Sequence, residues 1–186
     1  PVYSANGTVA EITGTVDSFR AAVGALNSGA INATSGRREI NWDGVPDASA
    51  DPGFIAGDFF NLGTGGRARG LEFSSPTPGA QFMVSANAGG SESVAFGYPG
   101  DFTAFSAQRM FATVGGLVTE VRFFDPTRPA VRATTSAFGA VFEDVETAGD
   151  TTLSYYDLND QLLLTVEVAA GASGSLSFGG AVFESA

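Results

Sequence analysis

The stretch GRREINWDGVPD, residues 36–47, brings together charged, amide and indole side chains that could bind a ligand. If it is a strand, Ile40 and Trp42 point toward a core and the opposite face carries oxygen ligands. Alternate side chains on a strand lie roughly 6.6–7 Å apart, too far to hold one metal ion but suited to a sugar chain or a salt-bridge ladder. The structural alternative is that Arg37 or Arg38 pairs with neighbouring acids. The candidate ligand-binding residues of this face are Glu39, Asn41 and Asp43.

Carbohydrate recognition by a β protein uses exposed aromatic rings together with amide and carboxylate hydrogen bonds. Tyr98, in FGYPGDF, is the aromatic residue with the most loop-like surroundings. Tyr155 and Tyr156 follow one another, so only one of them can face a core, and Tyr156 is taken as the binding candidate. Trp42 joins the candidates if its face assignment is inverted, and packing is the alternative for every ring.

A second candidate site is a group of carboxylates around a glycine turn in FEDVETAGDTT, residues 142–152. Calcium takes six to eight oxygen ligands, so a Ca²⁺ ion would need such a group. The calcium-loop pattern DxDxDG is absent, and DLND at 157–160 is better explained as the tip of a hairpin. A solvated acidic face is the alternative. The candidate calcium ligands are Glu143, Asp144, Glu146 and Asp150.

The chain contains no histidine, cysteine or lysine, and its nine basic residues are all arginines. This excludes Ser-His-Asp triads, cysteine nucleophiles, Schiff-base lysines and histidine-bound zinc. Paired carboxylates about 5–10 Å apart, as in glycosidases, remain feasible, but no spacing singles out such a pair. The sequence therefore predicts a protein that is not an enzyme.

Charge and hydropathy limit the partners. Twenty acidic residues against nine arginines give a net charge of −11, which repels nucleic acids and anionic membranes and favours cations. No apolar run reaches the roughly 18–20 residues of a membrane span, so membrane insertion is not expected.

The composition of the chain and the spacing of its turn residues predict an all-β fold. Sixteen phenylalanines, twenty-five glycines and many β-branched residues favour short strands and tight turns in one domain over residues 1–186. A single short helix is expected at 16–28, with Asp17 as its N-cap, after an N-terminal arm or strand at 1–15. Residues 44–70 read as a long irregular connection.

Alternating segments predict a hairpin near 71–86 and six further strands. The class is therefore an antiparallel β-sandwich, of jelly-roll type. The six strands are expected at RMFATV, LVTEVRFF, AFGAVFEDV, TTLSYYD, QLLLTVEV and SLSFGGAVFES.

Several of these segments, taken in order, carry a resemblance: GRREINWDGVPD, GDFFN, RGLEFSSP, FSAQRMFATVGGLVTEVRFF, FGAVFEDVE and TTLSYYDLNDQLL. Together they resemble a group of exported bacterial domains found in proteins with a PEP-CTERM-type surface-sorting tail. The resemblance implies a β-rich extracellular module, secreted or at the cell surface, with its leader peptide removed. It supplies no catalytic residues.

Two departures from that group shape the expected partners. The sorting tail is absent, and the chain stops at Ala186, where related domains continue into one more strand. A missing strand would leave a sheet edge open to pairing with a second copy of the chain.

Three functions follow from the sequence, in order. The first is a non-catalytic extracellular structural or adhesive module of the cell surface or matrix. The second is a carbohydrate-binding module with a structural calcium ion, and the third is a carboxylate-dependent glycan-cleaving enzyme.

Overall fold

The computed structural model describes residues 1–27, 36–62, 65–87, 94–106 and 108–184. The chain divides into two compact units, each described here by itself. The terminal unit comprises Pro1–Ala25, Gly100–Phe105 and Thr134–Ala186, and the central unit comprises Leu26–Pro99 and Ser106–Ala133. A single domain over residues 1–186 stays a prediction.

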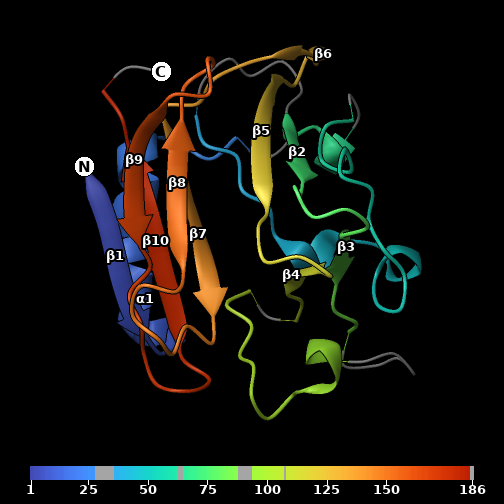
Figure 1. The fold of residues 1–186 in the computed structure, drawn as a ribbon, viewed down its shortest axis with the longest axis vertical. Coiled ribbons are helices and arrows are strands. Elements are labelled where there is room, and N and C mark those ends of the chain that lie inside the picture. The colour runs from blue at the N-terminus through green and yellow to red at the C-terminus, as the bar shows by residue number, and fades with distance from the viewer. Residues whose placement is uncertain (28–35, 63–64, 88–93, 107, 185–186) are drawn as a thin grey trace. The chain divides into compact units, whose positions relative to one another are not determined.

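The terminal unit has three layers built on an antiparallel sheet, shown in Figure 1. The sheet has the order β1 (Val2–Gly7), β10 (Leu176–Val182), β7 (Ala137–Glu143). One face is covered by helix α1 (Val9–Val23), and the other by the hairpin of β8 (Thr152–Tyr156) and β9 (Leu162–Glu167). The central strand β10 is therefore buried on both faces.

Successive side chains of β10 point to opposite faces of the sheet, so they contact the two outer layers in turn. Leu176 and Phe178 pack with Ile12 and Val16 of α1. Ser177 points the other way and donates its hydroxyl to the carbonyl of Ala169, at 2.6 Å.

Two glycines let the helix approach this sheet closely. Gly139 on β7 lies directly opposite Gly180 on β10. A Cβ on Gly139 would lie 3.0 Å from the Phe178 ring, and one on Gly180 would lie 3.2 Å from the Phe19 ring. The absent side chains make room for these two rings, which meet edge to face at 5.4 Å.

Helix α1 begins earlier than predicted. Its N-cap is Thr8, which forms a capping box with Glu11: the Thr8 hydroxyl accepts the Glu11 N–H, and the Glu11 carboxylate accepts the Thr8 N–H at 2.8 Å. The predicted range 16–28 with Asp17 as N-cap is wrong, because Asp17 lies inside the helix and pairs with Arg20 at 3.0 Å. The helix ends at Val23, before Gly24 with φ 110°.

The central unit contains two small antiparallel sheets and several single-turn 3₁₀ helices. One sheet has the order β2 (Leu71–Ser74), β5 (Glu120–Asp125), β6 (Arg128–Arg132), and the other pairs β3 (Gln81–Val84) with β4 (Phe111–Val114). The 3₁₀ helices are η1 (Trp42–Gly44), η2 (Asp47–Ser49), η3 (Gly65–Arg67) and η4 (Ala95–Gly97). The described part of 44–70 contains only such turns and isolated bridges, which confirms the irregular connection.

The predicted hairpin near 71–86 is wrong, although both of its strands exist. The β2 strand pairs with β5, and β3 pairs with β4. The irregular segment 55–57 hydrogen-bonds to both strands: Phe73 donates its N–H to the carbonyl of Gly57, and Ile55 donates its N–H to the carbonyl of Phe82, each at 2.9 Å. Alternation predicts strands but does not choose their partners.

The strand alternation predicted over RREINWD, residues 37–43, is also wrong. Residues 38–41 have no regular structure, and Trp42 opens a 3₁₀ turn. The Asn41 side chain accepts the N–H of Asp43 at 2.8 Å, so it caps this turn instead of flanking a ladder. The two-face assignment of Glu39, Asn41, Trp42 and Asp43 therefore has no strand to support it.

The predicted fold class is confirmed: in the described part of the chain, ten antiparallel strands form sheets that do not close into a barrel, with one long helix near the N-terminus. All six further predicted strands are present as β4, β5, β7, β8, β9 and β10. Strand β6 was not predicted, because it contains Pro129 and its other four residues are all exposed, so it shows no alternation of apolar and polar positions. The last strand, β10, is paired on both sides, with β1 and β7, so it is not itself an edge strand. Pairing with a second copy through an open edge stays a prediction.

Candidate functional site

Trp42 packs in an aromatic cluster of the central unit. Its ring stacks on Phe111, with centroids 4.6 Å apart and planes inclined by 13°. Phe60 meets the indole edge-on at 5.8 Å, and Phe73 lies 6.0 Å away. The indole therefore makes several aromatic packing contacts, and its side chain is half-buried.

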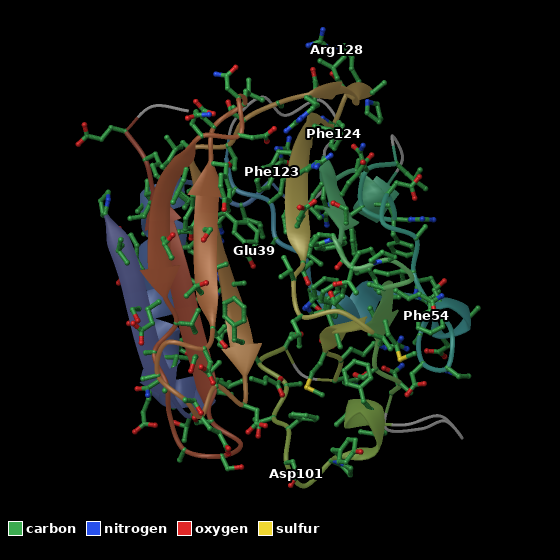
Figure 2. The ribbon with its side chains drawn as sticks, viewed as in Figure 1. Glu39, Phe54, Asp101, Phe123, Phe124 and Arg128 are labelled. Carbon is green, nitrogen blue, oxygen red and sulfur yellow. The ribbon has the colours of Figure 1, made fainter. Side chains whose placement is uncertain are left out.

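The three oxygen-bearing candidates near Trp42 each have a structural partner. Glu39, labelled in Figure 2, accepts the Nε–H of Arg37 at 2.6 Å. Asn41 caps η1, and the Asp43 carboxylate accepts the backbone N–H of Arg109 at 2.7 Å. The structure does not arrange these groups as one ligand-binding face.

Arg109 is the buried polar centre of the central unit, and the sequence reasoning missed it. Its side chain is 1% exposed; Nε donates to Asn87 Oδ1 at 2.6 Å, and the guanidinium forms an ion pair with Asp47. The Asp47 side chain is 85% exposed, so water solvates the anionic partner. The arginine holds η2 and Asn87 against the start of β4, which is a structural task. Its sequence signal was a lone arginine directly before an apolar strand.

The two tyrosine candidates belong to different units. Tyr98, in the central unit, follows η4 and is 59% exposed. Tyr156, at the end of β8, is 57% exposed. Tyr155 faces inward and donates its hydroxyl to the carbonyl of Phe138 at 2.9 Å, and burial raises its pKa to about 12. The structure thus gives the two neighbouring tyrosines opposite faces, as alternation required.

The four candidate calcium ligands do not gather. Among the residues that the structure describes, no group of three or more carboxylates is placed to hold a metal ion. Val145, between them in sequence, is buried at 5% exposure, and Asp144 has φ 58°. The backbone therefore turns sharply here and disperses the acids Glu143, Asp144, Glu146 and Asp150.

Glu143 is a half-buried carboxyl at the end of β7. Its pKa is raised to about 7, chiefly by burial and also by the negative charge of Asp144, while a hydrogen bond from the Thr103 backbone opposes the shift. Its Oε2 atom has no hydrogen-bond partner among the described residues. A carboxyl that holds its proton near neutrality suits acid–base chemistry, but only where it can reach a substrate.

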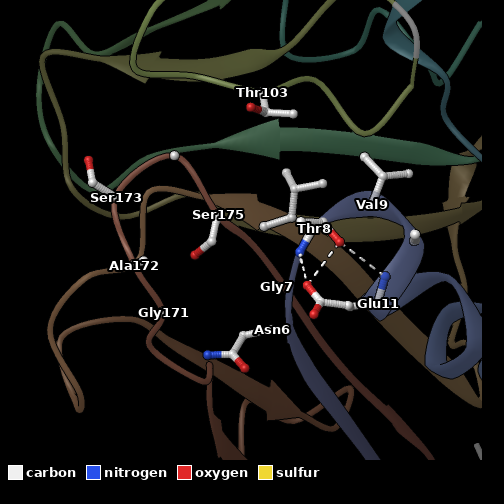
Figure 3. Close-up of a pocket in the computed structure, with 13 residues that line it drawn as sticks. Asn6, Gly7, Thr8, Val9, Glu11, Thr103, Gly171, Ala172, Ser173 and Ser175 are labelled. Carbon is white, nitrogen blue, oxygen red and sulfur yellow. Dashed lines mark hydrogen bonds between the residues drawn. The ribbon is translucent and has the colours of Figure 1, made fainter.

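A pocket of about 560 Å³ opens beside the start of α1, shown in Figure 3. Its walls come from residues 6–11, Thr103 and the loop 171–176, and Glu143 is not among them. The capping box occupies the Thr8 hydroxyl and the Glu11 carboxylate, whose pKa is lowered by the hydrogen bonds from Thr8. These two groups of the lining are therefore engaged in capping the helix.

The most exposed apolar surface of the terminal unit lies at the turn that joins β8 to β9. We call residues 156–163 the hairpin end. Four large apolar side chains there are more than half exposed, while Val166 further along β9 is buried at 5%. They are Tyr156 (57%), Leu158 (52%), Leu162 (58%) and Leu163 (55%).

Sequence reasoning found Tyr156 but missed the three leucines. It predicted QLLLTVEV as a strand without saying which of its side chains are exposed, and in the structure its first two leucines are both more than half exposed. The available signal was the run of three leucines, because alternation can bury only every second one.

Comparison with known proteins does not identify a family for this chain. No protein-family model matches the chain, and neither the curated proteins nor the solved structures give a match. In the described residues, no helix combines the length and hydropathy that crossing a bilayer requires.

Proposed function

We propose that the chain is a non-catalytic extracellular module that adheres to a partner surface through the hairpin end. The observation that carries the proposal is the exposure of four large apolar side chains within eight residues. Folded proteins rarely expose grouped large apolar residues without an interaction that covers them.

The energetics suit adhesion better than tight binding. Covering four side chains that are already half buried would contribute roughly 1 kcal/mol each, or about 4 kcal/mol in all. That free energy corresponds to roughly millimolar affinity before the cost of association. Useful attachment by such a surface therefore needs many copies or additional contacts.

The non-catalytic part of the proposal is supported by the available side chains. Glu143, with its raised pKa, does not line the pocket, and Thr8 and Glu11 are engaged in capping. Reducing-sugar release from a panel of polysaccharides tests this part. Activity that disappears with Glu143→Gln would overturn it and favour a carboxylate-dependent enzyme.

Adsorption of the purified chain to methyl-terminated and hydroxyl-terminated monolayers tests the adhesive surface. We expect preferential adsorption to the methyl surface, reduced by the double variant Leu162→Ser/Leu163→Ser. Leu117→Ser is the matched control, because Leu117 is fully exposed in the central unit. Equal losses in both variants would show general stickiness and contradict a defined adhesive surface.

Carbohydrate binding is the second candidate function, favoured by the exposed Tyr156 ring at the same hairpin end. Asp157, Asn159 and Asp160 follow it and could supply hydrogen bonds to sugar hydroxyls. A glycan array compares the native chain with Tyr156→Ala and with Tyr98→Ala. Saturable binding lost only with Tyr156→Ala would favour this candidate; the proposal does not extend to calcium, since the described acids form no metal group.

A further inference from the structure

The charge of the chain is divided very unequally between its two units. The terminal unit contains eleven carboxylates and one arginine, for a formal charge of −10. The central unit contains nine carboxylates and eight arginines, for a formal charge of −1. Nearly all of the net charge of −11 therefore belongs to the unit that carries the hairpin end.

The one arginine of the terminal unit does not offset the charge at the hairpin end. Arg20 lies on α1, which covers the opposite face of the sheet, and it pairs with Asp17 at 3.0 Å. No arginine occurs after Arg132, so β7, β8, β9 and β10 carry no positive side chain.

Two carboxylates border the exposed leucines directly. Asp157 accepts the backbone N–H groups of Asn159 and Gln161, at 2.8 and 2.9 Å, and these hydrogen bonds lower its pKa. Asp157 is therefore ionised at neutral pH. Asp160 is exposed at the turn itself.

From this charge distribution we infer that the hairpin end docks a cationic segment of a partner protein, in which apolar residues are flanked by arginine or lysine. The inference rests on the adhesive function proposed above and names the class of partner. Apolar contact with the leucines supplies the short-range attraction, and the negative field of the terminal unit supplies the long-range selection.

The same field disfavours the other occupants of this surface. A second copy would bring another −10 unit against the first, and anionic membranes or nucleic acids would be repelled equally. A neutral apolar partner would gain no electrostatic attraction from Asp157 and Asp160.

The test uses the full chain and three labelled heptapeptides, with binding followed by fluorescence anisotropy. The probe is Arg-Arg-Leu-Val-Leu-Arg-Arg. One control replaces its arginines with glutamates, and the other replaces Leu-Val-Leu with Ser-Gly-Ser. We expect binding of the probe alone, weakened several-fold between about 50 and 300 mM salt.

Substitutions in the chain test whether the probe peptide binds at the hairpin end. Leu162→Ser/Leu163→Ser should weaken binding of the probe by about thirtyfold, because two apolar contacts are lost. Asp160→Asn tolerates the positive φ of 59° and should weaken it about two- to threefold. Leu117→Ser and Asp58→Asn, at exposed positions of the central unit, are the matched controls and should leave binding unchanged.

The outcomes separate this inference from the proposed function. Equal binding of the arginine and glutamate peptides, both lost with the leucine variant, would overturn the cationic partner and leave the adhesive surface standing. Absence of peptide binding with leucine-dependent adsorption to methyl monolayers would do the same. Probe binding that the leucine variant does not change would overturn the inference, and monolayer adsorption equally unchanged would overturn the proposed function as well.

Discussion

Trp42 lies nearly parallel to Phe111, with ring centroids 4.6 Å apart, so the only tryptophan of the chain joins an irregular loop to strand β4. The stretch that looked most like a ligand site in the sequence is therefore a packing element of the central unit. The charged residues around Trp42 fix the loop through Arg37, Asn41 and Arg109.

Trp42→Ala should destabilise the protein by about 3 kcal/mol, because it removes a large ring from the aromatic cluster. Urea unfolding followed by circular dichroism measures the change. Tyr98→Ala, at a position that is 59% exposed, should cost less than about 0.5 kcal/mol. Equal effects of the two substitutions would contradict the packing role of Trp42.

Thr8→Ala should cost about 1 kcal/mol, because it removes the hydroxyl that caps α1. For a chain of this length the melting temperature should fall by about 2–4 °C. Asp17→Ala, at the N-cap expected from sequence, should cost only about 0.3 kcal/mol through the lost Arg20 pair. The reverse order of the two effects in a thermal melt would place the helix start at Asp17 instead.

Arg109→Met should destabilise the protein by about 2 kcal/mol, measured by urea unfolding. The substitution leaves Asn87 Oδ1 without its donor, although the exposed Asp47 can be rehydrated. Arg128→Met is the control, because Arg128 is 68% exposed and pairs with Asp125 on the surface. Its cost should stay below about 0.5 kcal/mol, and a similar cost for both arginines would refute the buried role of Arg109.

Glu143 should make stability depend on pH in a defined direction. Its pKa is raised from 4.5 to about 7 in the folded state, so folding favours the protonated form. This contribution is fully present below about pH 4.5 and is lost as the pH rises through about 7.

Glu143→Gln should therefore flatten the decline of melting temperature between about pH 4.5 and 7. Above pH 7 the variant should be the more stable one, by about 1 kcal/mol after allowance for solvent screening. Glu143→Met, which also cannot ionise, should flatten the same decline. Parallel pH curves for the native chain and both variants would show that Glu143 is not the responsible group.

Local patterns predicted most elements correctly but not their partners. The strands β2 and β3 read as a hairpin because PTPG lies between them, yet the segment 55–57 hydrogen-bonds to both. Nothing in the alternation of 71–86 could show this, since an irregular segment far away in sequence provides the bonds. The capping box at Thr8 and Glu11 was visible in the sequence, by contrast, and was overlooked.

At the candidate site, too, some features were predictable from local sequence patterns and others were not. Tyr156 was selected because it neighbours Tyr155, and alternation correctly required the two rings to separate. The run of three leucines indicated that they could not all be buried, but it did not show that Leu162 and Leu163 are both exposed. The structure shows that both leucines are more than half exposed.

The amino-acid sequence by itself determined the antiparallel β class, the acidic character and the lack of imidazole, thiol and amine chemistry, because these depend on composition and local alternation. The tertiary structure decided that Trp42 packs inward, that Arg109 is buried, that β10 is central and that the acids near Glu143 do not gather. It also placed ten of the eleven net negative charges in the unit with the hairpin end. These features depend on which distant segments pack together, and a single sequence carries no local signal for that choice.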